Sequence, residues 1–246
     1  MPFRSCLIYG DPGGVKTSAA LNALKPMGYR DIDWRVKRLS GVSLKDVEVI
    51  ELNHPLSGMD LSSIAKLAAG NMNIPFLPQG YLSLVGEIEK LAKRPVEERP
   101  KTLVIDSLTR SCEHLKRLIM HVNKVGGLRP LDWGTYLSNL EELATKLQYL
   151  SSFMNVVLVA HVSVEKDEST GQIRYYPLTQ GKMEGKLGGY FDEVYLMTKK
   201  ETVSSGAAKT EYQFMTNYPS NRYIARTSRG LNIPQFISAN LADLDA

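Results

Sequence analysis

The sequence predicts an α/β fold whose central sheet is mostly parallel, flanked by helices, with an antiparallel extension near the C-terminal end. Short apolar segments alternate with amphipathic ones over most of the chain, which is the pattern of strand–helix units. Residues 156–160 are apolar throughout, as in a strand that is buried on both faces. A glycine-rich turn separates the first apolar segment from a helical pattern. No shift in composition marks a boundary, so we expect a single domain over residues 1–246.

The individual elements follow from periodicity and from glycine and proline positions. Strands are expected at residues 3–9, 29–36, 47–52, 102–105, 156–160, 193–198, 211–216 and 222–227. Helices are expected at residues 16–24, 60–69, 81–93, 111–124 and 137–153. The last helix is the clearest, because apolar residues recur in it at helical spacing. The last three strands, with a tip at residues 203–210, form the expected antiparallel extension.

Composition narrows the classes of function. With 246 residues, 43% of them hydrophobic, the chain can bury a normal core. It has no apolar run of the roughly 20 residues that span a bilayer and its first residues lack a signal-peptide pattern, so we expect a cytoplasmic protein with no membrane partner. The net charge of +4 permits a polyanionic partner without requiring one. Cys6 and Cys112 lack metal-ligand spacing and are expected to be buried and reduced.

The glycine-rich turn predicts a phosphate-binding loop. Residues 10–18 read GDPGGVKTS, close to the pattern G-x-x-x-x-G-K-[ST]. Glycines let backbone amides turn toward an anion, and the following helix points its positive end at the same place. Lys16 is expected to reach the β and γ phosphates of ATP, and the Thr17 hydroxyl to coordinate Mg²⁺. The expected cradle consists of Gly10, Asp11, Pro12, Gly13, Gly14, Val15, Lys16, Thr17 and Ser18.

Val15 departs from that pattern, because the glycine expected directly before the lysine stands one place earlier, at Gly14. A β-branched residue at positive φ would be strained, so we expect Gly14 to take over that conformation. The departure bears more on hydrolysis than on nucleotide binding.

Two later strands end in polar residues, which a parallel sheet brings to one edge. Residues 102–105 lead into Asp106, the pattern of a carboxylate that holds Mg²⁺ beside the loop threonine. His161 follows the apolar run that ends at residue 160. It would either sense the γ-phosphate or simply bond to the backbone.

The carboxylate that activates water has two candidates. Glu51, at the end of its expected strand, is the first, and Asp33 is the second. Either side chain could instead be solvated.

Four segments together resemble the phage-encoded RecA-like ATPases of the AAA family, which include single-strand annealing proteins of the Sak type. The segments are GDPGGVKTS, TLVIDSLTR, RYIARTSRG and residues 156–196, with H-x-x-x-E-K-D and F-D-E-V. The resemblance covers residues 8 to about 234. It implies a RecA-like P-loop core that binds ATP and Mg²⁺ and acts on single-stranded DNA in phage recombination or replication. It further implies ring or filament homo-oligomers, a single-strand DNA-binding protein as partner, and a bacterial host cytoplasm.

The resemblance also assigns roles to residues. Lys16 and Thr17 carry over as phosphate and magnesium residues, Asp106 as the metal-holding acid, and His161 as the strand-end polar residue. No clear D-x-E pattern follows the second strand, so the resemblance leaves the catalytic base open.

Proteins of this type bind DNA through two mobile loops, which here correspond to residues 124–135 and 163–190. Basic side chains there could neutralise phosphates, and aromatic side chains could stack on bases. The expected DNA-binding residues are Lys124, Arg129, Lys166, Arg174, Lys182 and Lys186. Acidic residues dilute the charge of the second loop, and the alternative is an ordinary solvated surface.

Arg226 and Arg229 are candidates for a residue that completes the nucleotide site of a neighbouring subunit. The alternative is a surface strand with solvated arginines. For the whole chain, the leading hypothesis is a DNA-binding ATPase that pairs or anneals single strands. A nucleotide-switched assembly protein that does not hydrolyse ATP is the second, motivated by Val15, and a small-molecule kinase is the third.

Overall fold

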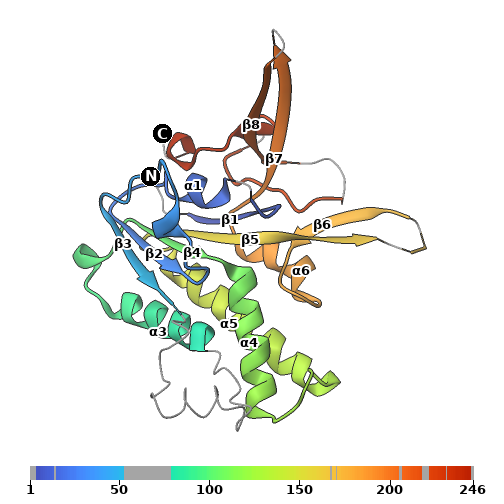
Figure 1. Ribbon diagram of the computed structural model, residues 1–246. Helices are drawn as coiled ribbons and strands as arrows, with labels where there is room; N and C mark the ends of the chain where they lie inside the picture. Colours follow the sequence, from blue (N-terminus) through green and yellow to red (C-terminus); the bar gives the residue numbers. More distant parts are fainter. Residues whose placement is uncertain are drawn as a thin grey trace, which may run out of the picture.

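The computed structural model describes residues 4–13, 15–52, 79–166, 168–169, 171–204, 207–217, 222–230 and 232–244. Within these ranges the chain forms one sheet with helices on both faces (Figure 1), in agreement with the sequence prediction. The helix expected at residues 60–69 lies outside the described residues. None of the helices in the described ranges is long and apolar enough to cross a bilayer.

In the described part of the chain, nine strands form the sheet in the order β3-β2-β4-β5-β1-β7-β8-β9, and β6 pairs with β5 beside this path. The strands are β1 Ser5–Gly10, β2 Met27–Asp31, β3 Val47–Glu51, β4 Thr102–Asp106, β5 Asn155–Lys166, β6 Ile173–Pro177, β7 Glu193–Ser204, β8 Ala207–Met215 and β9 Phe236–Ser238. Every neighbouring pair from β3 to β7 in this order is parallel. The carboxyl ends of β1, β2, β4 and β5 therefore share the edge at which ligands bind in open α/β sheets.

Helices of unequal length cover the two faces of the sheet. They are α1 Lys16–Ala20, α3 Gln79–Lys93, α4 Leu108–Val122, α5 Pro130–Leu150 and α6 Met183–Lys186, with short 3₁₀ turns η1 Val36–Arg38, η2 Val96–Glu98, η3 Leu187–Tyr190 and η4 Leu241–Leu244. The long helices α3, α4 and α5 pack on one face, and α1 packs on the other (Figure 1). The apolar stripe predicted for α5 is buried against that first face. Each fully buried leucine contributes about 1.5–3 kcal/mol to stability.

The connection between α4 and α5 is shorter than predicted, because α5 begins at Pro130 and not near residue 137. Proline is well tolerated in the first turn of a helix. The Asp132 carboxylate accepts a hydrogen bond from the Arg129 backbone amide (2.9 Å), which caps the same end. Trp133, expected on a mobile loop, lies in the helix and packs edge-on against Tyr136 with ring centroids 5.5 Å apart. The second half of the predicted DNA loop, residues 130–135, is therefore helical.

The second predicted DNA loop, residues 163–190, contains regular structure. β5 does not stop at residue 160 but continues to Lys166 and pairs antiparallel with β6. Helix α6 and the turn η3 follow. The second half of β5 is more exposed than its buried first half and is therefore polar. Hydrophobicity alone did not predict this part of the strand.

One further prediction near the C-terminal end was wrong. Residues 222–227 form no continuous strand and make only isolated bridges, from Tyr223 to Tyr175 and from Arg226 to Val194. Instead β9, at Phe236–Ser238, pairs with β8 and completes the antiparallel extension. The expected pairing of the two preceding strands is confirmed by β7 and β8. Near the N-terminus, α1 ends at Ala20 and β2 at Asp31, before their predicted ends.

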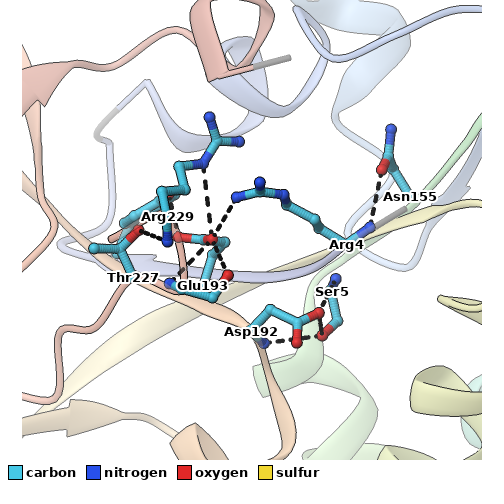
Figure 2. A network of polar contacts seen from close by, with 9 residues as sticks. Arg4, Ser5, Asn155, Asp192, Glu193, Thr227 and Arg229 are labelled. Atoms are coloured by element: carbon cyan, nitrogen blue, oxygen red, sulfur yellow. Dashed lines mark hydrogen bonds and ion pairs between the residues drawn. The ribbon is translucent and has the colours of Figure 1, made fainter. Parts of the chain in front are cut away.

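A buried carboxylate joins the C-terminal segment to the opposite, amino edge of the sheet (Figure 2). Glu193, at the start of β7, accepts hydrogen bonds from Arg4 Nη1 (2.9 Å), Ser228 Oγ (2.7 Å) and the Tyr195 hydroxyl (2.6 Å). Arg229 Nε lies 3.7 Å from the same carboxylate. Burial acts to raise the pKa of Glu193, but the hydrogen bonds outweigh burial and the pKa is lowered.

We predict that Glu193→Ala lowers the free energy of unfolding by about 3 kcal/mol, because removal of one partner leaves buried charge without compensation. Arg4 keeps 27% of its side chain exposed, which limits the loss to the lower end of the range for buried pairs. Urea unfolding at neutral pH measures it. Glu211→Ala is the control, since Glu211 pairs with Lys209 on the exposed β7–β8 hairpin and should change nothing measurable. Equal losses in both variants would contradict the structural role of Glu193.

Candidate nucleotide-binding site

The phosphate loop leaves the sheet where β1 is tightly packed against β7. A Cβ atom added to Gly10 would lie 3.0 Å from both Cβ and the carbonyl oxygen of Met197, so only glycine fits this close approach. Gly13 has φ +79°, a left-handed conformation that favours glycine. The chain then enters α1 at Lys16. The predicted order of strand, glycine-rich turn and helix is therefore present.

Val15 adopts an ordinary conformation. It has φ −78° and ψ 27° directly before α1, so its β-branched side chain is not forced to positive φ. Gly14, which we expected to take over that conformation, lies outside the described residues. The departure from the usual loop pattern thus brings no strain at Val15.

Lys16 is buried and its ammonium group points back into the loop. Its Nζ donates hydrogen bonds to the carbonyl oxygens of Gly10 (3.0 Å) and Asp11 (2.6 Å). Burial lowers the pKa of Lys16, and the nearby Asp106 and Asp11 charges oppose that shift. A buried ammonium group that is bonded only to neutral carbonyls is well suited to bind phosphate. Its hydrogen bonds to charged phosphate oxygens would be stronger than those to the carbonyls.

Thr17 and Asp106 meet although they are far apart in the sequence. The Thr17 hydroxyl donates to Asp106 Oδ2 at 2.6 Å. Hydroxyl and carboxylate oxygens are the ligand types that Mg²⁺ takes in proteins, so this pair fits the expected metal. Burial raises the pKa of Asp106, and hydrogen bonds from Thr17 and Tyr29 oppose the rise.

Tyr29 is a member of the site that sequence analysis missed. It lies on β2, and its hydroxyl donates to Asp106 Oδ2 at 2.5 Å, so that one oxygen accepts from both Tyr29 and Thr17. Burial raises the pKa of Tyr29, which keeps the phenol a donor at neutral pH. No local motif marks this residue, because the contact depends on the pairing of β2 with β4.

The two candidates for the water-activating carboxylate lie in different places. Asp33 follows β2 and accepts a hydrogen bond from the Ser107 hydroxyl (3.3 Å), next to Asp106 in the chain. Its charge also acts on the pKa of Lys16 and of Asp106. Glu51, the first candidate, ends β3 and pairs with Lys37 at 3.3 Å. Since β2 separates β3 from β4, the structure brings Asp33 to the site and leaves Glu51 outside it.

His161 lies on β5 directly opposite Gly10 of β1. Its backbone amide donates to the Thr109 hydroxyl (3.0 Å), while its buried ring Nδ1 has no hydrogen-bond partner among the described residues. Burial and the charge of Lys16 lower the pKa of the imidazole. The ring is therefore a neutral polar group at the phosphate edge, as the sensor hypothesis requires.

The expected DNA-binding residues are spread over several elements. Lys124 and Lys182 are exposed after α4 and before α6. Lys166 is exposed at the end of β5, and Arg174 of β6 lies opposite Glu165 of β5. Two others have acidic partners on α5: Arg129 pairs with Asp132 (2.9 Å) and Lys186 with Glu141 (3.2 Å).

The two candidate arginines lie away from this chain's own phosphate loop. The Arg226 backbone pairs with Val194, which lies opposite Leu7 in the middle of the sheet. The Arg226 side chain is exposed. Arg229 lies beside Glu193 at the amino edge. Neither residue contributes to the nucleotide site of its own chain.

We predict that Asp106→Asn stabilises the metal-free protein while it removes stabilisation by Mg²⁺ with ATP. Because burial raises the pKa of Asp106 above its unfolded value of about 3.9, the folded state is destabilised as pH rises through the folded pKa. An uncharged amide avoids that cost. We expect a higher unfolding midpoint at neutral pH, measured by differential scanning calorimetry, with about 2–4 °C for each kcal/mol of destabilisation removed. A lower midpoint in the absence of metal would contradict this account of the carboxylate.

Comparison with known proteins places the chain in a family. A search of the curated proteins gives no match. Among solved structures, the flagellar accessory protein FlaH from Methanocaldococcus jannaschii aligns over 96% of this chain and 84% of its own, with 10% identity and a TM-score of 0.44. A KaiC-like protein from Pyrococcus horikoshii OT3 aligns over 86% of this chain and 78% of its own, with 13% identity and a TM-score of 0.42. The family model described as AAA domain matches residues 3–229, so this protein belongs to the AAA domain family.

Proposed function

We propose that this protein binds ATP together with Mg²⁺ and hydrolyses ATP to ADP and phosphate. The observation that carries the proposal is the 2.6 Å contact between the Thr17 hydroxyl and Asp106, at the mouth of the loop that holds Lys16. Membership of the AAA domain family supports the same function class, a nucleotide-binding NTPase. The unstrained conformation of Val15 is compatible with hydrolysis.

In the proposed reaction each residue has a separate task. Lys16 exchanges its bonds to the loop carbonyls for bonds to the β and γ phosphates. Thr17 and Asp106 would hold Mg²⁺, which when bound would neutralise charge on the phosphate oxygens, and Tyr29 keeps the Asp106 carboxylate in position. Asp33 orients the attacking water and accepts its proton.

His161 gives the site a way to sense its own state. The ring Nδ1, which lacks a partner in the described part of the chain, is available to a γ-phosphate oxygen or to the attacking water. β5 continues from His161 into the β5–β6 hairpin. A change in the orientation of His161 can therefore shift the backbone of the hairpin directly.

We predict that Asp33→Asn lowers the rate of ATP hydrolysis by about 10²–10⁴-fold, the usual contribution of a general base, with little change in ATP affinity. Glu51→Gln, the matched control outside the site, should keep its activity. Phosphate release and calorimetric ATP binding measure the two effects. Loss of activity in Glu51→Gln with normal activity in Asp33→Asn would reverse the assignment. ATP binding without phosphate release by the wild type would favour the nucleotide-switched assembly protein, and phosphate transfer to a metabolite would favour a kinase.

We further propose that the β5–β6 hairpin binds single-stranded DNA. Lys166 is exposed at its tip, and Arg174 and Tyr176 lie on its second strand. The hairpin starts at His161, so DNA binding and nucleotide state would influence each other. Lys186 and Arg129 support DNA binding less well, since each has an acidic partner on α5.

We predict that Lys166→Ala weakens binding of an oligothymidine and lowers the slope of log affinity against log salt by about 0.7, the value for one phosphate contact on a single strand. Lys101→Ala is the control, because Lys101 is an exposed lysine at the amino end of β4. Fluorescence anisotropy over a salt series measures both slopes. An unchanged slope in Lys166→Ala, or the same decrease in Lys101→Ala, would contradict a DNA contact at the hairpin.

The biological setting that we propose rests on the sequence resemblance. It is the annealing of single strands in phage DNA metabolism by a ring or filament of this protein, together with a single-strand DNA-binding protein. Of the two arginines proposed to act on a neighbouring subunit, Arg226 is the better candidate because its side chain is exposed. Arg229 is instead engaged with Glu193.

A further inference from the structure

A cavity of about 250 Å³ lies beside the phosphate loop and has no part in the chemistry proposed above. It opens beyond the end of β1, where the β5–β6 and β7–β8 hairpins diverge (Figure 1). Its lining includes Asp11, Met197, Tyr175, Tyr212 and Tyr223. We call it the tyrosine cavity.

The tyrosines of this cavity come from three separate segments. Tyr175 of β6 and Tyr223 stack with ring centroids 4.8 Å apart and planes 17° apart. The Arg222 guanidinium lies 5.5 Å from the centroid of each ring, which fixes the stack by cation–π attraction. Tyr212 comes from β8, on the other hairpin. Half-buried aromatic rings on two walls suit a flat ligand with apolar faces.

The tyrosine cavity and the phosphate loop share a wall. Asp11 lines the cavity, and its carbonyl oxygen accepts the hydrogen bond from Lys16 Nζ at 2.6 Å. Met197 also lines the cavity and packs directly on Gly10, the first residue of the loop. A ligand whose phosphates contact Lys16 therefore has the cavity as its immediate neighbour.

The order of the strands gives the direction in which such a ligand would run. Asp106, Asp33 and His161 belong to β4, β2 and β5 or follow them, all on one side of β1. The cavity reaches from Val162 and Tyr175 of the β5–β6 hairpin past the end of β1 to β7 and β8, on the other side of β1. A nucleotide with its γ-phosphate near Asp106 would thus direct its base toward the tyrosines.

We propose that the tyrosine cavity holds the nucleobase of the nucleotide whose phosphates bind at the loop, and this inference rests on the proposed ATP site. Pockets for complete drug-sized ligands measure about 300–1,000 Å³, so the smaller tyrosine cavity fits one ring system. The base stacks on the tyrosine rings, and Asp11 accepts a hydrogen bond from an exocyclic amino group. The base then gains affinity from Tyr175, Tyr212 and Tyr223, independently of the binding of the phosphates by Lys16.

Calorimetric titration with ATP and with inorganic tripolyphosphate separates the two contributions. For Tyr212→Leu we expect ATP affinity to fall roughly ten-fold, as for loss of one stacking contact, with tripolyphosphate affinity unchanged. Tyr212→Phe, which keeps the ring, should bind both ligands like the wild type. Tyr223→Leu tests the other wall and should repeat the selective loss, so the proposal does not depend on the folding of one variant.

The controls distinguish failure of the cavity from failure of the phosphate site. Lys16→Ala should lose both ligands; if it keeps both, the ATP site itself is wrong. Tyr149→Leu, at an exposed tyrosine of α5, should change neither affinity. Equal losses of ATP and tripolyphosphate in the cavity variants, or no loss of either, would overturn the base assignment. Unchanged ATP affinity with weaker oligothymidine binding would also overturn it, and would assign the cavity to a base of the single strand.

Discussion

The nucleotide site depends on one buried carboxylate oxygen. Asp106 Oδ2 accepts hydrogen bonds from the Thr17 hydroxyl, at the start of α1, and from the Tyr29 hydroxyl, on β2. These bonds connect three segments of the chain at one point, and they oppose the cost of burying the charge, which raises the pKa of Asp106. A bound cation would compensate the charge of an ionised carboxylate that is buried in this position. The threonine and the acid are therefore positioned by the same contact, next to the loop lysine.

The parallel register of the sheet explains why these residues meet. β2 pairs with β4, β4 with β5 and β5 with β1, so the segments that follow their carboxyl ends lie at one edge. The same order separates tasks on the two sides of β1. Groups proposed for metal binding and water activation lie toward β4 and β2, while the tyrosine cavity reaches from the β5–β6 hairpin past the end of β1 to β7 and β8. The continuous strand β5 connects the site to the β5–β6 hairpin.

Local patterns predicted the parts of the fold whose cause is local. The glycine-rich turn, the apolar run of β5 and the apolar stripe of α5 each follow from neighbouring residues, and all were found. Errors arose where a partner decides the outcome. Residues 222–227 contain three consecutive apolar residues, yet β8 pairs with β7 from Leu196 onward and β1 takes the other side of β7, so this segment makes only isolated bridges. The start of α5 was missed because Pro130 and the Asp132 cap were interpreted as loop residues.

The sequence by itself therefore determined the type of site: a phosphate loop with Lys16 and Thr17, and an acid at the end of a buried strand. These features depend on residues that are close together in the chain. The order of strand, turn and helix is sufficient to predict how these residues are arranged. Only the tertiary structure decided which distant groups join them. Strand order placed Asp33 and Tyr29 at the site and Glu51 outside it, and the divergence of two hairpins formed the tyrosine cavity. Strand pairing is a long-range property, and no local pattern encodes which strands become neighbours.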